Sequence, residues 1–179
     1  MCSNLVRSGM KQPYEPPSVC TFFIMTREEK YMREALLEAR KAYEEDEVPI
    51  GCVIVLNDEI IARAHNHKEQ NKDPLSHAEI EAIRLAVSKI NSRYLNDCEL
   101  YVTLEPCLMC AGAISHSRLN RVIFGASDPK TGSIKSNLNY LEYKGINHHP
   151  DVMAGVMEEE SSHILKEFFA RKRALKFNK

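Results

Sequence analysis

Three side chains with metal-binding chemistry stand at spacings that can bring them around one ion. Cys107 and Cys110 are three positions apart in Pro106-Cys107-Leu108-Met109-Cys110, so on a helix they share one face. His77 opens a separate helical segment and can supply a nitrogen ligand. A catalytic zinc site uses three protein ligands and leaves the fourth position for water, and no further Cys or His is well placed. The sequence therefore predicts an open catalytic site with one Zn²⁺ per subunit.

Glu79 follows the histidine by two positions, so it can lie beside the metal without binding it. Zinc lowers the pKa of bound water towards about 7, which makes hydroxide available at neutral pH. A carboxylate next to that water can accept its proton and pass it to a ring nitrogen and a leaving amine. The combination of His77-x-Glu79 with Pro106-Cys107-x-x-Cys110 predicts this hydrolytic chemistry.

Each motif taken alone has a simpler interpretation. A Cys-x-x-Cys pair in a chain of this type can be redox-active or can be two buried thiols. Ser76-x-x-Glu79 also matches a helix capping box, in which Glu79 would only satisfy a backbone N–H group. It is the joint presence of His77, Glu79 and the cysteine pair that favours the zinc site.

The elements that must position these residues alternate between strands and helices. Thr26 can cap a first helix that ends in the acidic run 44–47, and Asn57-Asp58 is a turn between two β-rich runs. A face of Ile80, Ile83, Val87 and Ile90 indicates a helix after the loop 65–74. The expected helices are 26–44, 76–90, 107–118 and 158–174, and the located strands are 50–56, 59–65, 100–104 and 121–124, with a loop at 128–132.

This order of elements predicts an α/β fold. We expect a three-layer α/β/α sandwich around a mixed five-stranded sheet, because the leading hairpin must be antiparallel while later strands are joined through helices. The chain has 179 residues, of which 44% are hydrophobic and 27% charged, as in an ordinary single globular domain. We assign that domain to residues 26–179.

The first 25 residues carry neither helical nor strand periodicity, and we expect a disordered leader there. An alternative is that Met25 is the true initiator. No apolar run approaches the roughly 20 residues of a membrane span, and Val19–Met25 lacks a cleavage pattern, so we expect a cytoplasmic protein. Its six cysteines are then thiols or metal ligands rather than a disulfide framework.

These motifs resemble the cytidine deaminase superfamily, and the wider sequence resembles its bacterial tRNA-specific adenosine deaminases. The resemblance covers about residues 26–175. It is carried by Glu47-Val48-Pro49-Ile50-Gly51, Asn66, His77-Ala78-Glu79-Ile80, Leu100–Cys107, Met109–Ala113, His116-Ser117-Arg118, Phe124-Gly125-Ala126, Asp128, Lys130-Thr131-Gly132 and Phe168-Phe169.

The resemblance implies roles around the reacting base. His77, Cys107 and Cys110 correspond to the zinc ligands and Glu79 to the proton shuttle. Asn66 corresponds to a residue that hydrogen-bonds the target base, although it can equally be a turn residue after a strand. Val48 and Pro49 correspond to residues of the pocket wall. Leu104 and Glu105 correspond to positions whose backbone groups contact the base edge.

The resemblance also implies a nucleic-acid substrate and a homodimer. The family converts the wobble adenosine of an arginine tRNA anticodon to inosine, which requires the base to leave its stack. Asp128 corresponds to a position near a flanking nucleotide, unless it only forms the turn before Pro129. Phe168, Phe169 and Arg173 correspond to a basic aromatic tail that contacts the anticodon stem-loop, although adjacent Phe residues on a helix usually place one in the core.

The net charge of −1 means that any nucleic-acid site must be a local basic patch. Arg171, Lys172, Arg173, Lys176 and Lys179 form such a patch in the tail, unless they are only a solvated helix face. Two other functions remain in competition. A guanine or small nucleoside deaminase would share the zinc motif. Its free-base substrate has no phosphates for a basic tail to neutralise, so the tail argues against this function. A non-catalytic RNA-binding module with structural zinc would not need Glu79.

Overall fold

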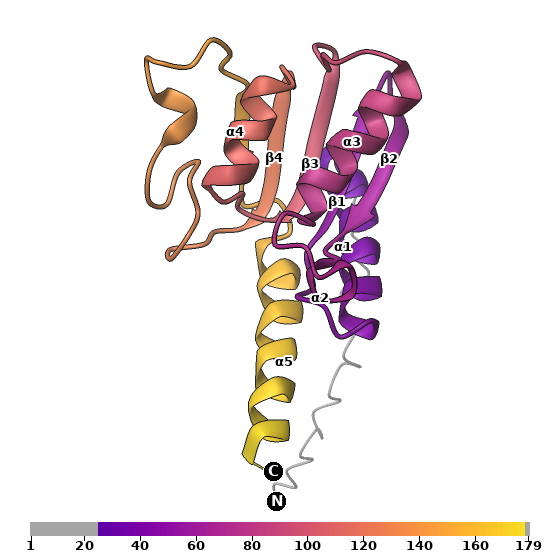
Figure 1. Cartoon of the computed structure of the whole chain (residues 1–179), viewed down its shortest axis with the longest axis vertical. Helices are drawn as coiled ribbons and strands as arrows, with labels where there is room; N and C mark the ends of the chain where they lie inside the picture. Colours follow the sequence, from indigo (N-terminus) through magenta and orange to yellow (C-terminus); the bar gives the residue numbers. More distant parts are fainter. Residues whose placement is uncertain (1–24, 178–179) are drawn as a thin grey trace, which may run out of the picture.

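A mixed five-stranded sheet forms the centre of the molecule in the computed structural model, which describes residues 25–177 (Figure 1). The strands lie in the order β2-β1-β3-β4-β5. β1 is antiparallel to β2 and β3, whereas β3, β4 and β5 are parallel. Their bounds are β1 Gly51–Leu56, β2 Glu59–His65, β3 Cys98–Leu104, β4 Arg121–Ala126 and β5 Asp151–Ala154. The predicted mixed sheet is confirmed.

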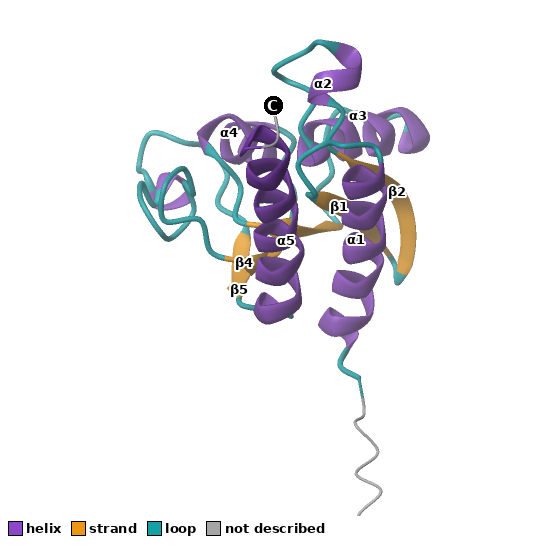
Figure 2. Cartoon of the chain, turned by 90° about the horizontal axis from the view of Figure 1, so that it is seen from below, coloured by secondary structure: helices purple, strands orange, loops and turns teal. Residues whose placement is uncertain are grey.

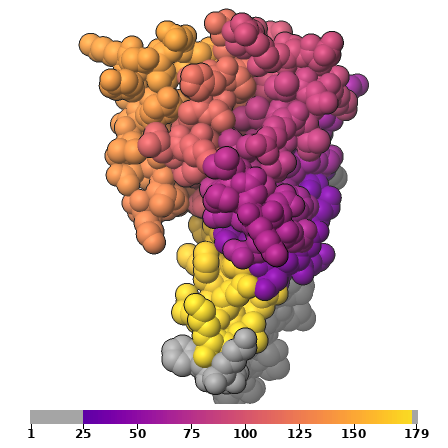
Figure 3. All heavy atoms as spheres, in the orientation of Figure 1, coloured from indigo at the N-terminus to yellow at the C-terminus, as the bar shows by residue number. Residues whose placement is uncertain are grey.

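Helices cover both faces of the sheet, which confirms the three-layer sandwich. α1 (Arg27–Glu44) and α5 (Glu158–Phe177) run side by side on one face, and α3 (Ala78–Ile90) and α4 (Leu108–His116) cover the other (Figures 1 and 2). α5 continues beyond the sheet as a protruding column (Figure 3). Two short helices, α2 (Lys68–Asn71) and η1 (Tyr140–Glu142), lie in the connections.

The alternation of side chains along β1 builds a core on each side of the sheet. Cys52 and Ile54 face α3 and α4, whereas Val53 and Val55 face α1. Because successive strand residues point to opposite faces, a fully apolar strand is what a sheet covered on both sides requires. Gly51 marks the closest approach, since a Cβ atom there would lie 2.0 Å from the Ala35 carbonyl oxygen of α1.

The start of α1 follows from local capping chemistry. The Thr26 hydroxyl accepts a hydrogen bond from Glu29 N at 3.1 Å, and the Glu29 carboxylate accepts one from Thr26 N at 2.8 Å. This reciprocal pair is a complete capping box. The predicted helix start is therefore confirmed.

Several elements differ from the sequence-based expectation. The buried apolar face of α3 is formed by Ala78, Ala82 and Ala86, whereas the isoleucine face that indicated this helix is only half-buried beside it. Small side chains let the helix lie close to the sheet, which places the larger ones at its margins. α2 interrupts the predicted loop 65–74, and β5 is the fifth strand that the sequence analysis did not locate.

The predicted leader lies outside the described residues, apart from the exposed Met25. Within residues 25–177 no helix combines the length and apolar composition needed to cross a membrane. The four cysteines in this range are all free thiols, as the sequence suggested.

Candidate active site

The ligand atoms of the predicted zinc site are presented at the first turns of two helices. His77 is the N-cap residue of α3 and Cys107 is the N-cap residue of α4. Both have extended backbone conformations, and neither side chain makes a capping hydrogen bond, so the imidazole and the sulfur stay free for other partners. Cys110 lies one turn into α4, on the same face as Cys107.

These three side chains converge on one point. His77 Nδ1 lies 3.8 Å from Cys107 Sγ and 3.6 Å from Cys110 Sγ. The pKa of Cys107 is lowered to about 4, first because the Cys110 thiol donates a hydrogen bond to it and also because His77 lies beside it. Two sulfurs and one imidazole nitrogen at these separations form a donor set suited to zinc.

Glu79 lies next to this group with an unsatisfied carboxylate oxygen. Its side chain is 3% exposed, and its Oε2 atom has no hydrogen-bond partner among the described residues. Burial raises the pKa of Glu79, an effect that the neighbouring His77 only partly offsets. A buried carboxylate oxygen without a partner is costly unless a ligand or water completes its hydrogen bonds. The residues thus fit a metal with an adjacent water.

The capping-box interpretation of Glu79 does not hold. The N-cap of α3 is His77 rather than Ser76. The Ser76 hydroxyl instead donates to the Asp73 carboxylate at 3.3 Å and accepts from Asn71. Glu79 therefore takes no part in a capping box at the start of α3.

Asn66 joins the end of β2 to the start of α3. It is 2% exposed, and its Oδ1 atom accepts a hydrogen bond from Ala78 N at 2.9 Å. Among residues 25–177 no protein acceptor is found for its Nδ2 group, which is thus available to donate to a ligand. The side chain does more than form a turn, because it satisfies one of the free N–H groups at the helix terminus that carries His77.

The side chain of Glu105 has a structural role in addition to the backbone role implied by the resemblance. Its backbone N–H donates to Ala126 O at 2.8 Å within the sheet, and its carboxylate is 2% exposed. That carboxylate accepts hydrogen bonds from the loop after β4, at Asp128 N, Ile134 N, Lys135 N, Ser136 N and the Ser136 hydroxyl. Leu104, the last residue of β3, pairs with Ala126. Glu105 therefore orders the loop that carries Asp128, while the contact of backbone groups at Leu104 and Glu105 with the base edge stays a prediction.

Asp128 forms a turn within that loop, as its simpler interpretation held. Its Oδ1 atom accepts from Lys130 N at 2.9 Å and Thr131 N at 3.2 Å. Gly132 lets the loop pass close to Glu105, because a Cβ atom there would lie 2.5 Å from the carboxylate. Nothing in this geometry prevents the half-buried Asp128 from meeting a ligand as well.

The two phenylalanines of the tail lie in different environments. Phe168 is 2% exposed and packs edge-on against Tyr43, whereas Phe169 is 44% exposed. Only the ring of Phe169 is accessible for the nucleotide contact that the resemblance implies, and Phe168 packs against it from the core. Both line an open groove of about 800 Å³ together with the half-buried Val48. The polar lining of this groove is mixed in charge: Lys172, Lys176, Gln70, Glu45, Asp46 and Glu69. Pro49, the residue after Val48, is buried.

The basic tail is partly neutralised within the chain. Arg171 and Lys172 both pair with Asp46, at 2.9 and 2.5 Å. Arg173 is exposed and takes part in no ion pair within the described range, so it is free to meet a phosphate. Lys179 lies outside the described residues.

Glu47 is a further residue of the site region that the sequence analysis did not single out. It is 1% exposed, and its carboxylate accepts hydrogen bonds from Glu69 N at 2.7 Å and Gln70 N at 2.9 Å. It thereby holds α2 next to Val48. One signal could have found it, since it is an acidic residue inside the segment that carries the family resemblance, but an acidic run at the end of a helix also indicates a helix terminus.

Comparisons with known proteins agree on one family. A family model described as MafB19-like deaminase matches residues 26–173. The chain is 49% identical over 145 residues to the tRNA-specific adenosine deaminase of Rickettsia typhi, covering 80% of this chain and 98% of that protein. It is 48% identical over 152 residues to the tRNA-specific adenosine deaminase of Bacillus subtilis, covering 85% and 94%.

Two solved deaminase structures are also similar to this chain. A structure from studies of A-to-I editing by tRNA:A34 deaminases at the wobble position of transfer RNA matches with a TM-score of 0.74 and 46% identity, covering 76% of this chain and 99% of that one. A guanine deaminase from Bacillus subtilis matches with a TM-score of 0.53 and 37% identity, covering 55% and 64%.

Proposed function

Because this chain belongs to the tRNA-specific adenosine deaminase family, we propose that it converts adenosine to inosine at the wobble position of a tRNA anticodon, with an arginine tRNA as substrate. One observation carries the chemistry. His77, Cys107 and Cys110 converge beside the buried, unpartnered carboxylate of Glu79. Similarity to tRNA:A34 deaminases supports the choice of substrate.

The reaction replaces the amino group at C6 of adenine with oxygen from water and releases ammonia. His77, Cys107 and Cys110 would hold Zn²⁺, one per subunit, which supplies hydroxide at neutral pH when bound. Glu79 accepts a proton from the attacking water and delivers it to N1 of the ring. It then carries the second proton, from the hydroxyl group now on C6, to the amino group, which leaves as ammonia. The free Nδ2 group of Asn66 donates a hydrogen bond to the base.

The groove beside the site favours a nucleic acid over a free base. Phe169 offers an exposed ring, and Arg173 and Lys176, which have no ion-pair partner among the described residues, offer positive charge on the same helix. Aromatic rings stack on unpaired bases, and cations pair with the phosphates that a free purine lacks. We infer that the anticodon stem-loop lies along this groove, with Val48 and Asp128 near the flanking nucleotides. We also propose that the enzyme acts in the cytoplasm.

A homodimer would cover an apolar surface on the α3–α4 face. Leu85 and Leu108 are 49% exposed there, and Met109 and Ala113 are half-buried on the same helix as Leu108. We propose that a second copy of the chain packs on this face, since the family resemblance implies a dimer. Light scattering should give twice the chain mass, and Leu108→Glu should give monomers.

A panel of substrates separates this function from its competitors. Purified protein is incubated with tRNA, with guanine and with free adenosine, and ammonia release is measured for each. We expect turnover of tRNA alone. Turnover of guanine in preference to tRNA would support the guanine deaminase alternative, and binding of tRNA without turnover would support a non-catalytic module.

A further inference from the structure

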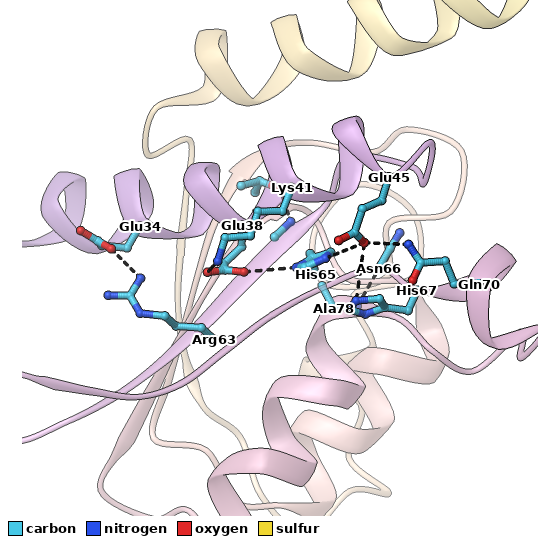
Figure 4. A network of polar contacts seen from close by, with 12 residues as sticks. Glu34, Glu38, Lys41, Glu45, Arg63, His65, Asn66, His67, Gln70 and Ala78 are labelled. Atoms are coloured by element: carbon cyan, nitrogen blue, oxygen red, sulfur yellow. Dashed lines mark hydrogen bonds and ion pairs between the residues drawn. The ribbon is translucent and has the colours of Figure 1, made fainter.

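A second cluster of potential metal ligands lies where β2 ends, outside the catalytic centre. Glu45, His65 and His67 hold their ligand atoms within 4.8 Å of one another (Figure 4). We propose that these three residues bind a second divalent transition-metal ion, of which Zn²⁺ is the representative. The ion would tie the C-terminal end of α1 to the segment that carries Asn66.

Distances within the cluster suit a shared ion. His65 Nε2 lies 3.1 Å from Glu45 Oε2, and His67 Nε2 lies 3.8 Å from the same oxygen. Ligands bound tetrahedrally to zinc at its usual bond lengths stand about 3.4 Å apart. The catalytic donors lie at comparable separations, 3.6 and 3.8 Å. Small side-chain movements would therefore complete either site.

The backbone places both imidazoles on one side. His65 is the last residue of β2, and His67 follows two positions later, so the alternation of an extended chain directs both towards α1. Their ring centroids lie 4.2 Å apart. Asn66, between them, points the other way and reaches Ala78 at the start of α3. One short segment thus serves the catalytic site with one side chain and the second cluster with its neighbours (Figure 4).

A buried carboxylate orients the first histidine. His65 Nδ1 lies 3.2 Å from Glu38 Oε2, and Glu38 is 3% exposed. Metal-binding histidines commonly donate their second ring nitrogen to a carboxylate, which fixes the tautomer and frees the other nitrogen for the metal. Glu38 is itself anchored by Lys41 at 2.7 Å. His65 is thus pre-oriented with Nε2 towards Glu45.

The third ligand is ionised and accessible. A hydrogen bond from His65 Nε2 lowers the pKa of Glu45, and the nearby His67 contributes to this; a bound metal ion would displace that Nε2 proton. The side chains of Glu45 and His67 are 39% and 29% exposed, so an ion can enter and water can fill its remaining positions. Two imidazoles with one carboxylate suit Zn²⁺, Ni²⁺ or Cu²⁺ better than Mg²⁺ or Ca²⁺, which prefer oxygen ligands.

Metal counting on the full-length, untagged protein tests the proposal. Equilibrium dialysis against Zn²⁺ at neutral pH should give two ions per chain for the wild type and one for His67→Ala. Glu45→Gln should also give one and serves as a second variant at an exposed position. His163→Ala is the matched control, since it removes an exposed histidine of α5 outside the cluster, and it should keep two.

Cobalt identifies which site is lost. Co²⁺ bound by Cys107 and Cys110 gives a thiolate charge-transfer absorption, whereas Co²⁺ bound by Glu45, His65 and His67 does not. His67→Ala should keep the absorption at full intensity while binding half as much metal. A wild type that binds a single ion, or a His67→Ala variant that binds as much as the wild type, would overturn the proposal and leave His65 as part of a purely hydrogen-bonded network. Neither result depends on any deaminase activity.

Discussion

Asn66 Oδ1 accepts a hydrogen bond of 2.9 Å from Ala78 N, so the residue proposed to bind the base also anchors the helix that begins with the proposed ligand His77. The hydrogen bond to Ala78 and the proposed hydrogen bond to the base use different atoms of the Asn66 amide. The oxygen serves the protein, and the Nδ2 group remains for the substrate. Substitutions can therefore test the donor and the acceptor separately at this position.

Asn66→Asp should retain the acceptor and lose the donor. We expect full zinc content, a loss of kcat/KM of about 10-fold or more, as for one hydrogen bond to the base, and a lower melting temperature, because the new carboxylate oxygen is buried without a donor. Asn66→Ala should lose activity and also stability, because Ala78 N is left unsatisfied in a buried position. Equal activity of Asn66→Asp and the wild type would rule out the base contact.

Glu105→Gln tests whether one buried carboxylate orders the loop 128–136. The amide can accept on only one of its two terminal atoms, so several of the backbone N–H groups lose their partner, and we expect a loss of about 2 kcal/mol in unfolding free energy. Hydrogen exchange of residues 128–136 should accelerate more than elsewhere. Glu142→Gln, an exposed change in the same connection, is the control and should alter neither quantity. Unchanged exchange in Glu105→Gln would refute the role.

The adjacent phenylalanines form a matched pair. Phe169→Ala should keep the melting temperature and weaken tRNA binding by about 10- to 100-fold, since stacking on a base contributes about 1–3 kcal/mol. Phe168→Ala should instead cost about 3–5 kcal/mol of stability, because it empties a filled core position. Thermal unfolding and a tRNA-binding assay on both variants check this. The opposite assignment of effects would mean that α5 is placed differently when tRNA binds.

Acid sensitivity of the fold should depend on Glu99. Burial raises the pKa of Glu99, but hydrogen bonds from Arg27 at 2.6 Å and Tyr101 at 2.8 Å outweigh it and hold the pKa below its usual 4.5. A carboxyl group whose pKa is lowered by folding adds stability above its unfolded pKa, and this is lost as pH falls through the folded value. We expect Glu99→Gln to cost about 1 kcal/mol at neutral pH and the difference from wild type to shrink below pH 4.5.

Glu59→Gln is the control for this measurement. Glu59 is exposed and makes no ion pair within the described range, so its pH profile should follow that of the wild type. Both variants keep the proposed zinc ligands. Any effect of acid on the metal site is therefore the same in each variant and in the wild type, and it does not contribute to the difference between them. A Glu99→Gln difference that stays constant down to low pH would contradict the assignment.

Features that depend on local chemistry could be predicted from the sequence. Thr26 and Glu29 specify a helix start within one turn, and Asn57-Asp58 connects two strands at the expected place, with both turn residues at positive φ. The spacing of Cys107 and Cys110 on a helix follows from its geometry alone. These signals require no knowledge of distant partners.

Features that depend on long-range partners could not be predicted. The carboxylate of Glu105 is defined by backbone N–H groups 23 to 31 positions away, and that of Glu47 by groups 22 and 23 positions away. The strand β5, Asp151–Ala154, is a short sheet edge with little burial, so it carries no alternating pattern. For α3, the periodicity of the sequence indicated an isoleucine face. Close packing against the sheet instead buries the alanines, because their side chains are small.

The most direct test of the account compares the wild type with Glu79→Gln on a tRNA that has adenosine at the wobble position. The wild type should produce inosine there, and Glu79→Gln should keep zinc and tRNA binding while its rate falls by about 10²- to 10⁴-fold. Glu81→Gln, a change at a half-buried position of the same helix, should stay active. Inosine formation by Glu79→Gln at the wild-type rate, or no inosine from a zinc-loaded wild type, would contradict the proposed site and its function.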